Sequence, residues 1–117
     1  MYKIETERAD LFDVNMMIAM QVIVSGNASE EKLTAAFSSA VLAFEILNCE
    51  IVIDNNGNAF YDDCASPKNS ITFRDFELSD LIREQERIRF RIEDGEFMRC
   101  YVLLTNTNEI KICFIIF

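Results

Sequence analysis

The side chains that most often carry out chemistry are few and scattered in this sequence. It contains no histidine, and a cysteine or serine nucleophile usually needs a neighbouring histidine as its base. The four cysteines, Cys49, Cys64, Cys100 and Cys113, form no C-x-x-C pair and so do not indicate a zinc site. The three glycines are isolated, and none belongs to a phosphate-binding loop. We therefore predict no catalytic residue and no metal ligand in this chain.

The stretch "DNNGN", residues 54–58, comes nearest to a metal-binding motif. Asp54, Asn56 and Asn58 fit the first three ligand positions of an EF-hand calcium loop. Ala59, however, stands where that loop needs glycine, and Ala65 stands where it needs a bidentate glutamate. The stretch is therefore predicted to be a hairpin turn and not a calcium site.

Two further pairs of side chains could act together only if the backbone brought them to one face. Asp62 and Asp63 are neighbours on a predicted strand, so their carboxylates point to opposite faces and share no substrate. If the last two strands form a hairpin about Asn106-Thr107, Cys100 lies directly opposite Cys113. We interpret these two thiols as small apolar residues that fill a sheet, not as a redox pair.

Length, composition and charge predict the number of domains, the partners that are disfavoured and the location of the protein. The chain has 117 residues, is 50% hydrophobic and has one proline, which predicts a single folded domain over residues 1–117. A net charge of −9 disfavours nucleic-acid binding, and "REQERIRFR", residues 83–91, is diluted by acidic neighbours. Because no apolar run has the length of a membrane span and no signal peptide opens the chain, we expect a cytoplasmic location and reduced thiols.

The first half of the chain predicts a strand followed by a helix. "MMIAMQVIV", residues 16–24, is mostly apolar and is predicted as a strand buried on both faces. The helix begins near Ser29, and either Asn27 or Ser29 can cap it. Glu30 and Glu31 lie favourably at the positive end of the helix dipole. Its apolar stripe consists of Leu33, Ala36, Phe37, Ala40, Val41 and Phe44.

The second half predicts two hairpins separated by a short strand and a second helix. The Asn56-Gly57 pair predicts a type I′ turn, because both residues tolerate a positive φ. "ITFRDF", residues 71–76, alternates as a half-buried strand, and Ser79 can cap a helix that buries Leu78, Leu81 and Ile82. From Arg87 the period changes to two, so the helix must give way to extended chain. The order β-α-β-β-β-α-β-β predicts an α+β fold, with a mixed, largely antiparallel sheet and two helices packed on one face.

The last predicted strand, "EIKICFIIF", is the most apolar in the sequence. One of its faces, which carries Ile110, Ile112, Phe114 and Ile116, can bury against the helices. The opposite face carries Cys113, Ile115 and Phe117, and no further layer is evident for it. We therefore expect this strand to mediate dimerisation or to contact a missing partner lobe, and we expect the chain to be the opening part of a longer protein.

Three segments carry a resemblance to a known family. They are the acidic stretch "ERADLF" at residues 7–12, the strand–turn–helix run from Gln21 to Leu47, and "RIEDGEFMRCYVLLTNTNEIKICFIIF" at residues 91–117. Together they resemble the amino-terminal part of the chloramphenicol-acetyltransferase-like superfamily, which includes condensation domains and alcohol acyltransferases. The resemblance spans nearly all of the chain. Met98 stands where leucine is usual in the family.

The resemblance implies a function that this chain cannot perform alone. In the family, the strand similar to "IKICFIIF" runs into an H-H-x-x-x-D-G motif whose second histidine is the general base, and this sequence ends just before that motif. The family's H-P-x-L-R motif is similar to residues 44–48, of which only Leu47 is kept. Asn48 replaces an arginine that can pair with the aspartate of the histidine motif. The resemblance thus implies the amino-terminal lobe of an acyltransferase that uses a CoA or phosphopantetheine thioester.

Two other functional classes remain open at this stage. The chain could be a stand-alone acidic α+β interaction module that self-associates or binds a partner protein. It could also be an unrelated ferredoxin-like domain, because that fold shares the β-α-β-β core order. Fold analogy alone does not choose among these functions.

Overall fold

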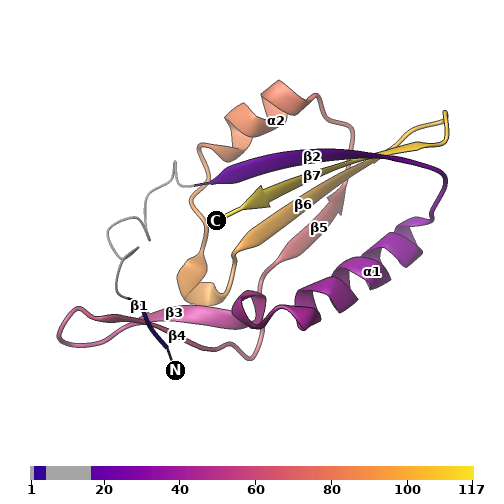
Figure 1. Ribbon diagram of the computed structural model, residues 1–117. Coiled ribbons are helices and arrows are strands. Elements are labelled where there is room, and N and C mark those ends of the chain that lie inside the picture. Colours follow the sequence, from indigo (N-terminus) through magenta and orange to yellow (C-terminus); the bar gives the residue numbers. More distant parts are fainter. Residues whose placement is uncertain (1, 5–16) are drawn as a thin grey trace.

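The computed structural model describes residues 2–4 and 17–117 (Figure 1). The acidic stretch at residues 7–12 therefore lies outside the described residues. After the short strand β1, the order of helices and strands confirms the predicted β-α-β-β-β-α-β-β. The elements are β1 (Tyr2–Ile4), β2 (Ile18–Ser25), α1 (Glu30–Ala43), η2 (Glu45–Asn48), β3 (Cys49–Ile53), β4 (Ala59–Asp63), β5 (Ser70–Phe73), α2 (Leu78–Gln85), η3 (Ile92–Asp94), β6 (Met98–Leu104) and β7 (Glu109–Ile116).

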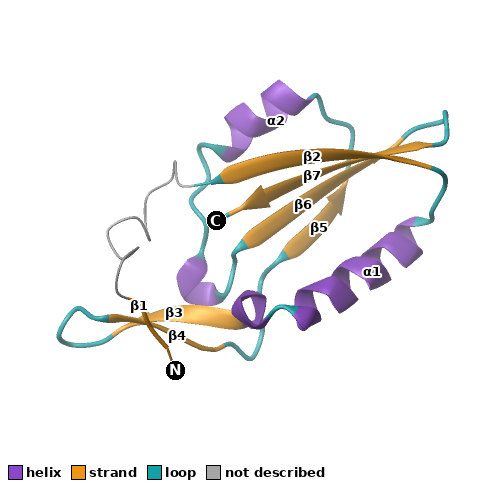
Figure 2. Cartoon of the chain, viewed as in Figure 1, coloured by secondary structure: helices purple, strands orange, loops and turns teal. Residues whose placement is uncertain are grey.

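The described strands form two sheets where the sequence predicted one (Figure 2). The larger sheet has the order β2-β7-β6-β5, in which β5 runs parallel to β6 and the other neighbours are antiparallel. The smaller sheet, β1-β4-β3, is antiparallel throughout. The prediction of a mixed, largely antiparallel α+β fold is therefore confirmed, while the number of sheets was wrong.

The two helices lie on opposite faces of the larger sheet, and not on one face as predicted. Leu33 and Phe37 of α1 pack with buried Val102 on one face. Leu81 of α2 packs with buried Ile115 on the other face. Because β7 is apolar on both faces, each face needs its own cover. The sequence pattern of each helix shows that it buries one side, but it does not show which face of the sheet receives it.

The face of β7 that seemed to lack a further layer is the best buried part of the molecule. Cys113 and Ile115 are fully buried on it. They belong to a core to which α2, η3 and the smaller sheet contribute, with Ile92, Ile51 and Ala59 among its buried members. The smaller sheet is thus the missing layer, and the expectation of an uncovered face on this side was wrong.

The hairpin between β6 and β7 has a register one residue away from the predicted one. Cys100 pairs with Phe114, so it does not lie opposite Cys113. The Thr105 amide donates to the Glu109 carbonyl at 3.2 Å, which leaves a three-residue loop whose last residue, Asn108, has φ 58°. Three-residue loops of this kind end on a left-handed residue, a conformation that asparagine tolerates. The one-residue shift places the two thiols on opposite faces of the sheet.

The hairpin between β3 and β4 is confirmed, but its turn is not type I′. The Gly57 amide donates to the Asp54 carbonyl at 3.1 Å, and the Asp54 amide donates to the Asn58 carbonyl at 2.9 Å. Of the Asn56-Gly57 pair, only Gly57 has a positive φ, at 81°. The Asp54 carboxylate accepts hydrogen bonds from the Asn56 and Asn58 amides, and these hydrogen bonds lower its pKa. Asp54 therefore organises the loop.

The helix caps agree with the sequence at α1 and differ from it at α2. The Ser29 hydroxyl accepts a hydrogen bond from the Lys32 amide, so of the two predicted caps of α1, Asn27 and Ser29, the structure has Ser29. At α2 the capping side chain is Glu77, whose carboxylate accepts from the Ser79 and Asp80 amides. Ser79, the predicted cap, instead donates its hydroxyl proton to Glu77. Glutamate is a less usual cap than serine, which is why the sequence favoured Ser79.

This cap predicts a pH-dependent loss of stability in a Glu77→Ala variant. Hydrogen bonds from the Ser79 hydroxyl and from the Ser79 and Asp80 amides hold the pKa of Glu77 below its ordinary value of 4.5. A carboxyl group with a lowered pKa stabilises the folded state above the unfolded pKa, and this contribution disappears as pH falls through the folded pKa. We expect Glu77→Ala to lower the melting temperature at pH 7, and we expect its difference from the wild type to shrink progressively as the pH falls below 4.5. A deficit that stays constant as the protein is acidified would contradict the capping role.

Candidate functional site

The cysteines lie in surroundings that suppress their reactivity. Burial raises the pKa of Cys100 to about 12, with a smaller contribution from nearby Cys113. Burial likewise raises the pKa values of Cys113 and Cys49, the latter with help from Asp63. A thiol must be deprotonated to act as a nucleophile, so these three cysteines are structural.

The burial pattern predicts the order in which the thiols react with iodoacetamide. Cys64 is half-buried, whereas Cys49, Cys100 and Cys113 are buried. In the folded protein at pH 8 we expect Cys64 to be alkylated first and the other three to react only after unfolding. Mass spectrometry of the digested protein measures this directly. Early labelling of Cys100 would contradict the buried position of its side chain.

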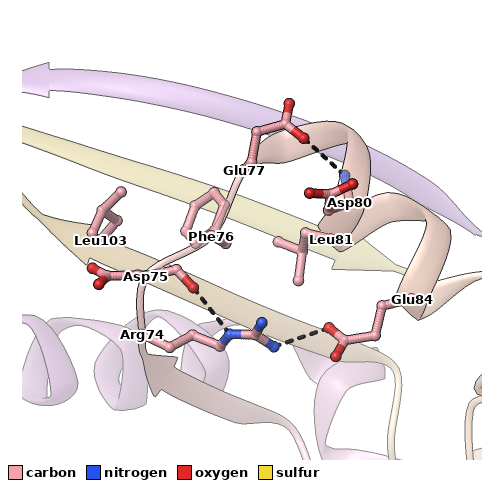
Figure 3. Close-up of a pocket in the computed structure, with 8 residues that line it drawn as sticks. All are labelled: Arg74, Asp75, Phe76, Glu77, Asp80, Leu81, Glu84 and Leu103. Atoms are coloured by element: carbon pink, nitrogen blue, oxygen red, sulfur yellow. Dashed lines mark hydrogen bonds and ion pairs between the residues drawn. The ribbon is translucent and has the colours of Figure 1, made fainter.

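A polar hollow of about 470 Å³ lies beside the start of α2 (Figure 3). The Arg74 guanidinium pairs with the Glu84 carboxylate at 2.9 Å and donates to the Asp75 carbonyl at 3.2 Å. The Glu77 carboxylate on the hollow's rim is engaged in capping α2. Across residues 2–4 and 17–117, no group of three or more histidine, cysteine or acidic side chains could hold a metal ion. Arg74, Glu84 and Glu77 each make a local structural contact in this hollow.

A buried arginine is the centre of a polar cluster that the sequence did not reveal. Arg99 is 4% exposed, and its guanidinium donates two hydrogen bonds to the Glu96 carboxylate at 2.8 and 3.2 Å. It also donates to the Gln85 side chain at 3.1 Å and to the carbonyls of Ile88 and Arg89 at 3.1 and 3.0 Å. No buried side-chain nitrogen or oxygen among the described residues lacks a partner. Arg99 thus ties the end of α2 and the chain that follows it to β6.

The Arg99 cluster adjoins the end of β7. The Arg99 guanidinium lies 4.1 Å from the centre of the Phe90 ring. The Phe117 ring packs edge-on against Phe90 and Phe97, with centroids 6.0 and 6.1 Å apart. The Phe117 amide also donates to the Phe97 carbonyl at 2.9 Å. Arg99 and these three rings therefore fix the position of the last residue of the chain.

Asn48, which stands where the family resemblance has an arginine, has a local structural role. Its side-chain amide donates to the carbonyls of Val41 and Phe44, both at 3.0 Å. The same two carbonyls also accept from the Phe44 and Leu47 amides, at 3.2 and 3.1 Å, so Asn48 adds a second hydrogen bond to each carbonyl at the end of α1. Leu47, the one position kept from the family motif, packs against the main core.

The strand predicted to be buried on both faces is an exposed edge strand. Strand β2 pairs only with β7, because it stands at the end of the larger sheet. Its side chains Ile18, Met20, Val22 and Val24 are 65%, 49%, 38% and 40% exposed. The sequence showed that these residues are apolar, but burial also depends on a neighbouring element that β2 lacks on one side. Residue 16, the first of the predicted strand, is not described.

Strand β7 lies inside the larger sheet and not at its edge. It lies between β2 and β6, and its backbone is paired on both sides. A partner that added a strand to the larger sheet would have to pair with β2 or β5, the two edges. Contact of the terminal strand with a partner lobe or a second copy therefore stays a prediction, and it would not be strand addition to β7.

An apolar cavity of about 220 Å³ lies between part of α1 and the larger sheet. Ala36 and Ala40 of α1 line it together with Ile112 and Phe114 of β7. Ala36 and Ala40 are also exposed to solvent. The helix therefore closes incompletely over this face of the sheet. No helix in the described part of the chain is long and apolar enough to cross a membrane.

Comparison with known proteins relates this architecture to solved condensation domains by fold. No family model and no curated protein matches the sequence. Solved structures do match the fold, with a TM-score of 0.74 for the condensation domain of the monacolin K polyketide synthase MokA, at 12% identity over 98% of this chain. The first condensation domain of the CDA synthetase has a TM-score of 0.74 and is 10% identical over 94% of this chain. The starter condensation domain of the rhizomide synthetase RzmA has a TM-score of 0.75 and is 8% identical over 98% of this chain.

These matches cover nearly all of this chain but only part of each neighbour. The chain spans 29% of the MokA structure and 30% of each of the other two. The fold resemblance inferred from the sequence is thereby confirmed. The chain has the α+β fold of a condensation domain and spans about 30% of the length of its structural neighbours.

Proposed function

We propose that this chain is the amino-terminal lobe of a condensation-type acyltransferase that uses a CoA or carrier-protein thioester. The observation that carries the proposal is the fold match over 94–98% of the chain to 29–30% of three condensation domains. The sequence resemblance supports the amino-terminal position, because the β6–β7 hairpin is similar to the family segment that leads into the histidine motif. One neighbour, the starter domain of RzmA, was solved with C8-CoA, which supports an acyl thioester as the donor.

The proposed reaction needs a base that this sequence does not contain. An amine or alcohol attacks the thioester carbonyl carbon, the C–S bond breaks, and a base accepts the proton of the attacking group. The sequence has no histidine, and the buried cysteines have raised pKa values. We therefore propose that residues outside these 117 supply the base. The lobe would contribute one wall of the active site and the aromatic support beneath Phe117.

An acyl-transfer assay tests this division of labour. We expect the 117-residue chain to transfer no acyl group from octanoyl-CoA to an amine acceptor above the uncatalysed rate. A longer protein that contains this chain followed by the histidine motif should transfer it, and changing the second histidine to alanine should remove the activity. Turnover by the short chain alone, or unchanged activity in the histidine variant, would contradict the proposal.

A second candidate is a stand-alone acidic interaction module that self-associates. The exposed apolar side chains of β2 favour it, because monomeric proteins rarely expose contiguous apolar patches. Under this alternative, the short chain forms a dimer whose mass is measured by light scattering after gel filtration. A monomer at all concentrations would leave the acyltransferase lobe as the better account.

A further inference from the structure

Strand β2 carries a row of exposed apolar side chains. We use the name β2 face for the exposed side chains Ile18, Met20, Val22 and Val24. They pair with Ile116, Phe114, Ile112 and Ile110 of β7 and lie on the same face of the sheet as α1. No charged residue occurs between Ile18 and Ser25, and the one amide side chain, Gln21, lies on the opposite face. From this surface we infer that the β2 face is a docking site for an amphipathic α-helix beside α1.

The width of the larger sheet leaves room for one more helix. Four strands about 4.8 Å apart span about 14 Å between the outer strand axes. A helix with its side chains is about 10 Å in diameter and covers about two strands. Helix α1 runs along β5, at the opposite edge of the sheet from β2 (Figure 2). The uncovered half is therefore about one helix wide.

The length of the β2 face sets the length of the docked helix. The exposed residues 18–24 span about 20 Å of extended chain. A helix rises about 1.5 Å per residue, so about fourteen residues cover that length. Helix α1, which covers the other half of this face, has 14 residues. The half of the sheet face beside β2 therefore fits a helix of about the same length as α1.

The chemistry of the surface defines the side chains that the helix must present. An uncharged apolar face binds an apolar stripe at positions i, i+3, i+4 and i+7. Ala36 and Ala40 of α1 are short, exposed, and line the cavity with Ile112 and Phe114. Their small size lets a second helix approach α1 closely and fill that space. The partner is therefore an amphipathic helix whose opposite face is polar.

The source of this helix follows from the proposed function, on which this step rests. The chain spans about 30% of its structural neighbours, so a longer protein of this fold has ample sequence to supply the helix in cis. The docking surface itself depends only on residues in this chain. If the longer protein transferred no acyl group, the proposed source of the helix would be lost, but the docking site would remain. If the helical peptide did not bind, the docking site would be lost, but the proposed function would remain.

The test uses the 117-residue chain and a labelled synthetic peptide of about fourteen residues. The peptide carries leucine at i, i+3, i+4, i+7 and i+8 and neutral glutamine or alanine elsewhere, and a scrambled peptide of the same composition is the control. We expect saturable binding of the striped peptide by fluorescence anisotropy, with a gain in helical circular dichroism. Met20→Lys should weaken this binding at least tenfold, and Val22→Lys should do the same.

The matched control is Ile23→Lys on the other side of the same strand. Ile23 is 55% exposed and pairs with Lys111, so it faces away from the β2 face. This variant should change peptide binding less than twofold, and circular dichroism checks that all variants fold. Equal binding of the scrambled peptide, no saturable binding, or equal weakening by Ile23→Lys would overturn the inference. A wild-type dimer that Met20→Lys dissociates would overturn it too, because a second copy would then occupy the face.

Discussion

Replacing Arg99 with methionine is expected to lower the free energy of unfolding by about 3–5 kcal/mol, as removal of one partner from a buried ion pair commonly does. The substitution leaves the Glu96 carboxylate and the Gln85 side chain without the guanidinium that they contact. It also leaves two backbone carbonyls, those of Ile88 and Arg89, without their donor. Urea unfolding followed by circular dichroism measures the loss.

The control is Arg91→Met in the same region of the chain. The Arg91 side chain is 65% exposed and pairs with Asp94 at 2.7 Å, and exposed ion pairs contribute at most about 1 kcal/mol. Arg99→Lys is also informative, because lysine keeps the charge but cannot donate to four groups at once. If Arg99→Met and Arg91→Met had similar effects, the Arg99 cluster would not hold the end of α2 to the sheet.

The second large effect is expected from Ile115→Ala near the carboxyl end of β7. Ile115 is fully buried, at 0% exposure, within the core shared by α2 and the smaller sheet. Truncation removes buried methyl groups and leaves a cavity, which typically costs about 2–5 kcal/mol. The same urea experiment measures this loss.

Ile116→Ala is the matched control on the next residue of the strand. Ile116 is half-buried and lies on the opposite face, where it pairs with exposed Ile18. We expect a clearly smaller loss of stability than for Ile115. A larger loss for Ile116 would mean that the face toward α1 is the better packed one, contrary to the structure.

The elements themselves were predictable because their signals are local. The apolar stripe and the capping residues before it defined α1, and alternating apolar residues defined β5. Two apolar runs on either side of "TNTN" defined the β6–β7 hairpin. The change from helical to alternating period near Arg87 predicted the end of α2, which the structure places at Gln85. Irregular chain and then η3 follow it. Each of these signals needs only neighbouring residues, so the order of elements could be determined from the sequence.

The predictions that were wrong concerned features that depend on contacts between distant segments of the chain. The Cys100–Cys113 register failed because the loop uses three residues, with Asn108 in the left-handed conformation, where a two-residue turn was expected. The helix placement failed because an apolar stripe does not specify which sheet face it covers. Strand β2 was predicted to be buried because its residues are apolar, while its place at the edge of the sheet leaves them exposed.

The polar cluster around Arg99 could not have been found from spacing alone. Glu96 and Arg99 are three residues apart, as in many exposed pairs, but Gln85 comes from another element. Only the fold brings the three side chains together. The Glu77 cap was missed for a simpler reason, because serine is the more common residue at that position.

Within the proposed function, these features divide into two groups. The Arg99 cluster and the rings of Phe90 and Phe97 hold Phe117 in place. In the family that the sequence resembles, the histidine motif follows directly after this position. The β2 face and the cavity beneath α1 form an apolar surface suited to a further element. The first group positions the last residue of the chain, and the second leaves an apolar surface open.

The most direct test of the proposed function is to read the coding sequence immediately after the codon for Phe117. The account predicts an open frame that continues into His-His-x-x-x-Asp-Gly and then into a sequence long enough for a second lobe. A stop codon directly after Phe117 would contradict it, since the proposed general base would then be missing from the protein. The self-associating interaction module would become the leading account.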